Sequence, residues 1–117
     1  MKVTLIEPKS KRPNVYHYVK LPLLGLPTLG SILKERGHEV EIYNEGYSPI
    51  DLREIKADIV GISALTPTAL RGYEILDFFR GRGVRTMIGG PHATFMPQET
   101  LEHADYVCVT FMKIHGF

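Results

Sequence analysis

Residues 58–65 read Asp-Ile-Val-Gly-Ile-Ser-Ala-Leu, and this stretch decides the fold. It is the most apolar segment of the chain, as a central parallel strand that is covered on both faces should be. Thr66-Pro67 follows directly, and a threonine before a proline is typical of a helix start. An apolar stripe at helical spacing then runs until Gly81 and Gly83; it comprises Ala69, Leu70, Tyr73, Leu76 and Phe79. The pattern predicts a central strand over 58–65 and a helix over 66–81.

Strands and helices alternate on both sides of this unit. Short apolar runs rich in β-branched residues predict further strands at 1–6, 39–43, 84–88 and 106–110. Helical spacing of apolar residues predicts a helix at 27–36. A short helix is also expected at 97–103, with one or two helical turns inside 51–56. Such alternation requires parallel pairing with right-handed crossovers. We expect a flavodoxin-like (Rossmann-like) three-layer α/β/α sandwich with a five-stranded parallel sheet in the order 2-1-3-4-5.

Composition limits the possible functions. The 117 residues suit one domain over 1–117, and 44% hydrophobic residues are ordinary for a globular chain. A net charge of +1 argues against binding to nucleic acid or to an anionic membrane. The single cysteine, Cys108, excludes an internal disulfide and a multi-cysteine metal site. The chain shows neither a signal peptide nor a run of about twenty apolar residues, so we expect a cytoplasmic protein.

The expected binding site lies where the parallel strands end, because ligands of such sheets bind beyond the carboxyl ends of the strands. Four residues of the third strand's exit are candidates, three with hydroxyls: Ser63, Leu65, Thr66 and Thr68. Hydroxyls and free amide groups there can bind a nitrogen or a phosphate, although Thr66 could equally serve as a helix cap. Gly89-Gly90 ends the fourth strand and lets a bulky group approach the backbone, although a tight turn would also favour glycine.

Together, Ser63-x-Leu65 and Gly89-Gly90 resemble two of the three motif elements of cobalamin-binding domains of the methionine synthase and mutase type. In that family the serine hydrogen-bonds the benzimidazole base of the cofactor's nucleotide tail, and the glycines let the tail enter between sheet and helix. The resemblance assigns these roles to Ser63, Leu65, Gly89 and Gly90. We therefore expect a Gly90→Val substitution to leave the fold largely intact and to obstruct the tail.

The third family element, Asp-x-His-x-x-Gly, is altered in this chain. The matching stretch after the first strand is Glu7-Pro8-Lys9-Ser10-Lys11-Arg12, so Lys9 replaces the histidine that ligates cobalt and Arg12 replaces the glycine. A protonated lysine is no cobalt ligand, so we expect no histidine ligation unless His17 or Tyr16 of the same loop reaches the metal. Tyr16, His17 and Tyr18 could line a corrin or simply anchor the loop.

A wider resemblance covers roughly residues 3–109. The segments 23–33, 37–40, 58–63 and 89–93 look like the amino-terminal domains of B12-dependent radical S-adenosylmethionine (SAM) proteins. The resemblance implies cobalamin as cofactor and partner, with its cobalt as the bound metal ion, and a C-terminal radical SAM barrel as a second partner. In such proteins that barrel, and not this domain, holds the 4Fe-4S cluster and S-adenosylmethionine.

The barrel's cysteine run is missing here, and residues 111–117 depart from the family pattern. We interpret the chain as an excised domain or a truncated gene product with a divergent tail. No residue is assigned a catalytic role, and catalysis, methyltransferase-like or related, would belong to the rest of the parent enzyme.

Two residues that follow the fourth strand keep two interpretations each. Pro91 and His92 follow the glycines, and His92 could contact the corrin, or the pair could simply shape the turn. Glu7 is the one carboxylate well placed for chemistry. The alternative to cobalamin binding is a degenerate B12-like domain that uses Lys9 and Arg12 to bind a protein partner, a nucleotide or another anion. Retention of the red cofactor after desalting distinguishes the two functions.

Overall fold

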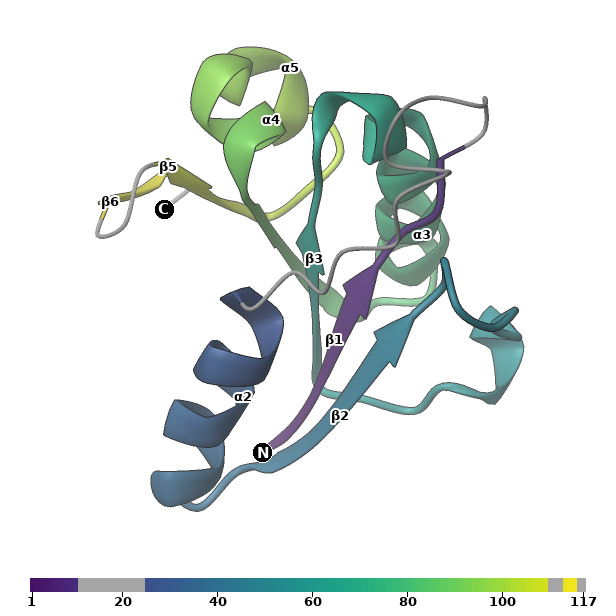
Figure 1. The fold of residues 1–117 in the computed structure, drawn as a ribbon, viewed down its shortest axis with the longest axis vertical. Coiled ribbons are helices and arrows are strands. Elements are labelled where there is room, and N and C mark those ends of the chain that lie inside the picture. The colour runs from purple at the N-terminus through teal and green to yellow at the C-terminus, as the bar shows by residue number, and fades with distance from the viewer. Residues whose placement is uncertain (11–24, 110–112, 116–117) are drawn as a thin grey trace.

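A computed structural model describes residues 1–10, 25–109 and 113–115, and shows a six-stranded sheet in the order β2-β1-β3-β4-β5-β6 (Figure 1). The strands are β1 (Lys2–Glu7), β2 (Glu39–Asn44), β3 (Ile59–Ser63), β4 (Arg85–Gly89), β5 (Tyr106–Val109) and β6 (Lys113–His115). The first five pair in parallel, whereas β6 is antiparallel to β5. The predicted flavodoxin-like sheet and its 2-1-3-4-5 order are confirmed, and β6 is an addition that the sequence did not predict.

Four α-helices and two 3₁₀ turns connect these strands. They are α2 (Gly25–Glu35), η1 (Leu52–Glu54), η2 (Thr66–Thr68), α3 (Ala69–Gly81), α4 (Pro91–Phe95) and α5 (Pro97–Leu101). The helix expected from residue 66 therefore begins with a 3₁₀ turn, and its α-helical part starts at Ala69. The short helix α4 was not predicted from the sequence.

The main core lies between the sheet and α3. Alternate residues of each strand face this side, among them Val60 and Ile62 of β3 and Ile88 of β4. From α3 they meet Ile75, Leu76 and Phe79, which are 1% exposed or less. Leu70 was expected in the same stripe but is 62% exposed, because its position in the first turn of α3 points away from the sheet.

On the opposite face of the sheet, within the described residues, α2 lies over β1 and β2 (Figure 1). Leu26 of α2 packs on Val3 and Leu5 of β1 in a second, smaller cluster. Leu29 and Ile32 were part of the apolar pattern that predicted this helix, but both remain exposed in the structure. In the part of the chain that the structure describes, no helix packs on β4 or β5 from this side.

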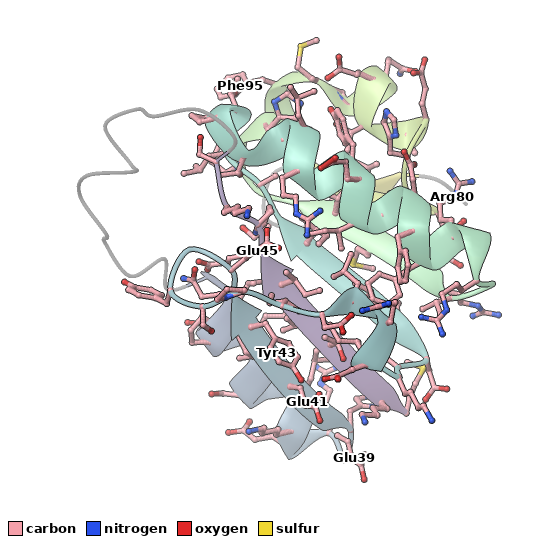
Figure 2. The ribbon with its side chains drawn as sticks, turned by 90° about the vertical axis from the view of Figure 1, so that its right-hand side faces the viewer. Glu39, Glu41, Tyr43, Glu45, Arg80 and Phe95 are labelled. Atoms are coloured by element: carbon pink, nitrogen blue, oxygen red, sulfur yellow. The ribbon has the colours of Figure 1, made fainter. Side chains whose placement is uncertain are left out.

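Strand β2 forms one edge of the sheet, as its alternating pattern predicted. Glu39 and Glu41 are exposed along it, and Tyr43 donates a hydrogen bond of 2.9 Å to Glu41 (Figure 2). None of the helices in the described segments is long and apolar enough to cross a bilayer.

Candidate functional site

Ser63 and Gly89 lie side by side at the carboxyl edge of the sheet. They end the adjacent parallel strands β3 and β4, and the strand register pairs one with the other. Alternation along β3 places Ser63 on the same side as Gly61, which faces Leu5 of the α2 side. A Cβ atom at Gly89 would lie 3.4 Å from the Cβ atom of Cys108, in ordinary contact and without backbone strain. The two motif residues thus share the sheet face that α2 leaves open over β4 and β5.

The Ser63 hydroxyl makes no hydrogen bond to another residue among those the structure describes, and its side chain is only half-buried. The backbone of Gly89 beside it carries no side chain. This pairing of a hydroxyl that has no protein partner with a bare stretch of backbone fits a flat aromatic base that brings an acceptor nitrogen. The observed residues therefore suit the tail of a cobalamin at this point.

Gly90 has a different role from the one expected. Its φ of +98° is in the region that favours glycine, and an added Cβ would lie 2.9 Å from the carbonyl oxygen of Ala64. The expectation that Gly90→Val leaves the fold largely intact is therefore wrong. Backbone hydrogen bonds close this turn: the N–H of Ala64 donates to Gly89 O and the N–H of His92 to Ala64 O, both at 3.1 Å.

The hydroxyls after β3 are used mainly by the protein itself. Thr68 Oγ1 accepts a hydrogen bond from the Leu65 N–H at 3.0 Å and donates one to Leu65 O at 3.1 Å. This pair fixes the 3₁₀ turn η2. Thr66 is exposed, and its hydroxyl lies 3.3 Å from Nδ1 of His92. Thr66 and Leu65 therefore remain accessible at the carboxyl edge, whereas Thr68 is fully engaged.

The imidazole of His92 faces the protein interior. Pro91 begins α4 and is exposed, but the His92 side chain is 6% exposed. Its Nε2 atom lies 2.6 Å from Tyr73 Oη and 3.1 Å from Glu99 Oε2. The ring is thus held between α3 and α5, and of the two interpretations of His92 the structure favours the one in which it shapes the turn.

Tyr73 is the central residue of this polar cluster. Burial, together with its hydrogen bond to Glu99, raises the pKa of Tyr73 to about 12, so the phenol stays protonated and donates to the Glu99 carboxylate at 2.6 Å. Its ring stacks on His103 with 4.1 Å between ring centroids. His103 in turn contacts Asp77 at 3.0 Å. This cluster was not predicted from the sequence, because its members come from three helices and one loop that are distant along the chain.

The loop after β1 is tied to the loop after β2. Glu7 is buried at the end of β1, where it accepts a hydrogen bond from Asn44 Nδ2 at 3.0 Å, and burial raises the pKa of its carboxyl. Lys9 is exposed, and its backbone N–H donates to Glu45 at 3.1 Å. Lys9 is therefore placed at the carboxyl edge with its ammonium toward solvent.

Glu45 forms a buried ion pair that the sequence did not reveal. Its carboxylate is 2% exposed and accepts two hydrogen bonds from Arg71 Nε and one from Nη2, the latter at 2.7 Å. Burial alone would raise the pKa of Glu45, but the hydrogen bonds from Arg71 and from the Lys9 N–H outweigh it and lower the pKa. This pair connects the β1 and β2 loops to α3.

Several candidates from the sequence lie outside the described residues, namely Arg12, Tyr16, His17 and Tyr18. Within the described segments, no group of three or more His, Cys, Asp or Glu side chains is placed to hold a metal ion.

A hollow of about 520 Å³ opens at the opposite, amino-terminal edge of the sheet. It is lined by Arg80, Gly83, Val84, Arg85, Asp105 and Tyr106. Arg80 is already engaged there, with Nε 3.4 Å from Asp105 and Nη1 donating to Glu102 O. We therefore place the candidate site at the carboxyl edge, where the motif residues meet, and not in this hollow.

Comparison with known families decides the assignment. The profile of the B12 binding domain matches residues 17–112, most of the chain. The chain belongs to the B12 binding domain family. Its sheet order is consistent with the flavodoxin-like fold of a B12-binding domain, and membership of this family supports cobalamin as the cofactor.

Two curated relatives are methyltransferases by name. The bacteriochlorophyllide d C-8(2)-methyltransferase of Chlorobaculum tepidum is 39% identical over 72 residues, which cover 62% of this chain and 16% of that protein. An uncharacterized methyltransferase of Pyrococcus horikoshii is 34% identical over 89 residues, which cover 68% of this chain and 19% of that protein. The B12-binding domain therefore matches less than one fifth of the length of either relative.

Proposed function

We propose that this B12-binding domain holds cobalamin at the carboxyl edge of its sheet, with the nucleotide tail against Ser63 and Gly89. One observation carries the proposal: the Ser63 hydroxyl, without a partner among the described residues, lies next to the bare backbone of Gly89 on a sheet face that no described helix covers there. Leu65, Thr66 and Pro91 border the same edge and complete the proposed contact surface.

Each residue would have a simple physical task. Ser63 would donate a hydrogen bond to a ring nitrogen of the base, and Gly89 would admit the ring by carrying no side chain. Gly90 would act indirectly, because its positive φ lets the chain turn toward Ala64 and keeps the end of β4 close to β3. Cobalamin, when bound, supplies a cobalt centre able to carry a transferable group.

The loop after β1 would face the cofactor without a histidine. Lys9 occupies the position of the family's cobalt ligand, and a protonated ammonium has no electron pair to donate to a metal. Glu7 and the Glu45–Arg71 pair would hold this loop in place, since Glu45 binds both the Lys9 backbone and α3. We propose that cobalt receives no histidine ligand from this domain.

In the larger protein, we propose that this domain presents cobalamin to a C-terminal radical SAM barrel of a methyltransferase-like enzyme. Two facts support this role. The two curated relatives are named methyltransferases, and both extend far beyond the matched region. The resemblance of residues 3–109 to the amino-terminal domains of B12-dependent radical SAM proteins points to the same arrangement. The 4Fe-4S cluster and S-adenosylmethionine would then belong to the barrel.

Cofactor retention tests the proposal. The purified chain is incubated with hydroxocobalamin, desalted and examined by visible absorption; we expect retained cofactor, and markedly less with Ser63→Ala or Gly89→Val. Thr86→Val is a matched control, because Thr86 is buried in the same strand at the opposite end, where its hydroxyl contacts Asp105. Paramagnetic resonance of the Co(II) form should show no coupling to a protein imidazole nitrogen.

Two outcomes would contradict the proposal. A folded chain that retains no cobalamin would favour the alternative, a degenerate domain that binds a protein or an anion. If both site variants retained as much cobalamin as the wild type, the nucleotide tail would not bind at Ser63 and Gly89.

A further inference from the structure

His92 joins the two turns that bear the motif residues. Its backbone N–H donates to Ala64 O at 3.1 Å, and its Nδ1 atom lies 3.3 Å from Thr66 Oγ1. Ala64 and Thr66 lie one and three residues after Ser63, and His92 lies two residues after Gly90. Residue 92 therefore contacts the β3 exit twice, once through its backbone and once through its side chain.

The other side of the His92 ring is anchored by α3 and α5. Tyr73 Oη, Glu99 Oε2 and His92 Nε2 form a triangle with sides of 2.6, 2.6 and 3.1 Å. Tyr73 is 7% exposed and also lies 3.5 Å from the Thr100 hydroxyl. The His92 and Tyr73 side chains are buried, whereas the Glu99 side chain is 44% exposed, so the carboxylate holds the inner two groups from the solvent side.

The hydrogen-bond pattern assigns the protons. Tyr73 has one proton and donates it to the Glu99 carboxylate, so His92 Nε2 must carry a hydrogen to bond with either oxygen. In the neutral ring Nδ1 is then an acceptor, and the Thr66 hydroxyl is its donor. The hydrogen bonds thus all run in one direction: Thr66 donates to His92, His92 donates to the Tyr73–Glu99 pair, and Tyr73 donates to Glu99.

We propose that His92 is a positioning residue of the cobalamin site, which couples the turn after Ser63 to the turn after Gly89 through Thr66 on one side and Tyr73–Glu99 on the other. This inference rests on the proposed function. The turn at Gly90 lies close to Ser63, because an added Cβ at Gly90 would lie 3.1 Å from Ser63 Oγ. A small rotation of α4 would therefore change the site where the tail binds.

Two nearly isosteric substitutions test this role. Tyr73→Phe removes only the hydroxyl that holds His92, and the ring can still stack on His103. Thr66→Val removes the hydroxyl on the other side, and Thr66→Ser restores it. We expect Tyr73→Phe and Thr66→Val each to weaken cobalamin binding by about tenfold, as is typical when a supporting partner of a ligand-binding group is lost. Thr66→Ser should bind like the wild type, and Thr86→Val is the control for loss of a threonine hydroxyl elsewhere.

The double variant separates positioning from direct contact. If Thr66 acts through His92, Tyr73→Phe and Thr66→Val together should weaken binding no more than either alone. A readout without cofactor is the ¹⁵N signal pattern of the His92 ring, which should show the Nε2–H tautomer in the wild type and a shifted Nδ1 in Thr66→Val. If Thr66 and Tyr73 had only a structural role, their substitutions would lower the free energy of unfolding in urea, but the ¹⁵N signals of His92 would not show this tautomer and its shift.

The outcomes distinguish the two proposals. A wild type that binds no cobalamin overturns the proposed function, and the positioning role with it. Binding by the wild type that is unchanged in Tyr73→Phe, or losses that add fully in the double variant, would overturn the positioning role alone. A wild-type Nδ1–H tautomer would also overturn it.

Discussion

At the scale of single residues, Gly90 shows how one backbone angle sets the geometry of a binding edge. Its positive φ brings residue 90 so close to Ala64 that no side chain fits between them. The same glycine that a sequence motif connects with a ligand is required by the fold itself. Substitutions there report on folding before they report on binding.

We predict that Gly90→Ala lowers the free energy of unfolding by about 1–3 kcal/mol, the usual cost of a strained backbone conformation. Urea denaturation of the folded chain measures the effect. Gly81→Ala is the control, since a Cβ at Gly81 meets nothing within 4 Å and its backbone conformation is ordinary. Equal stability of the Gly90 variant and the wild type would show that the turn relaxes at no cost.

Two buried carboxylates should respond to pH in opposite ways. The pKa of Glu45 lies below its ordinary value of 4.5, so its ion pair with Arg71 contributes stability above that value and loses it as the pH falls through the folded pKa. We predict that Glu45→Gln lowers the free energy of unfolding at pH 7 by about 1–3 kcal/mol. The difference from the wild type should shrink in urea titrations below pH 4.5.

Glu7 provides the contrasting case. Burial raises its pKa above the ordinary value of 4.5, so the folded state holds the proton more tightly than the unfolded state. Its stabilising effect is present at low pH and is lost as the pH rises through the folded pKa. Glu7→Gln should therefore be more stable than the wild type at pH 7 and equal to it in acid. Destabilisation at pH 7 would mean that the Asn44 contact requires the ionised carboxylate.

At the scale of the elements, α3 is the helix that holds the fold together. Its buried side contacts the centre of the sheet, and its outer side carries Arg71, which binds Glu45. We predict that Leu76→Ala, at a fully buried position, costs about 2–5 kcal/mol, whereas Leu70→Ala, at 62% exposure, costs less than about 0.5 kcal/mol. Because both variants delete the same atoms from one helix, their urea midpoints compare burial directly. Similar losses would contradict the observed orientation of α3.

The elements show what periodicity can and cannot predict. The five parallel strands and α2 were predicted within a few residues, because their apolar residues recur at the period of a strand or helix; the short helix α5 was predicted as well. Leu29, Ile32 and Leu70 fit the helical period but are exposed. Periodicity identifies an apolar side of a helix, but how much of that side is covered depends on neighbours that the local sequence does not show.

At the scale of the whole molecule, the location of the candidate site could be predicted from the sequence, but only some of its contacts could. Parallel topology alone locates ligands at the carboxyl ends of the strands, and the motif residues Ser63 and Gly89 do meet there. The cluster around Tyr73 and the Glu45–Arg71 pair were missed, since Tyr73 lies 19, 26 and 27 positions from His92, Glu99 and Thr100, Arg71 lies 26 positions from Glu45, and no spacing rule connects them. Long-range polar contacts of this kind become visible only after the chain is folded.

The exposed edge strand β2 has a consequence for the behaviour of many copies in concentrated solution. An open strand edge can recruit the same strand of another molecule and start aggregation. Here Glu39 and Glu41 project from that edge, with Lys2 near Glu41 at 3.7 Å (Figure 2). Two molecules that approach edge to edge would bring their glutamates together, and the repulsion between them would keep the sheets from joining.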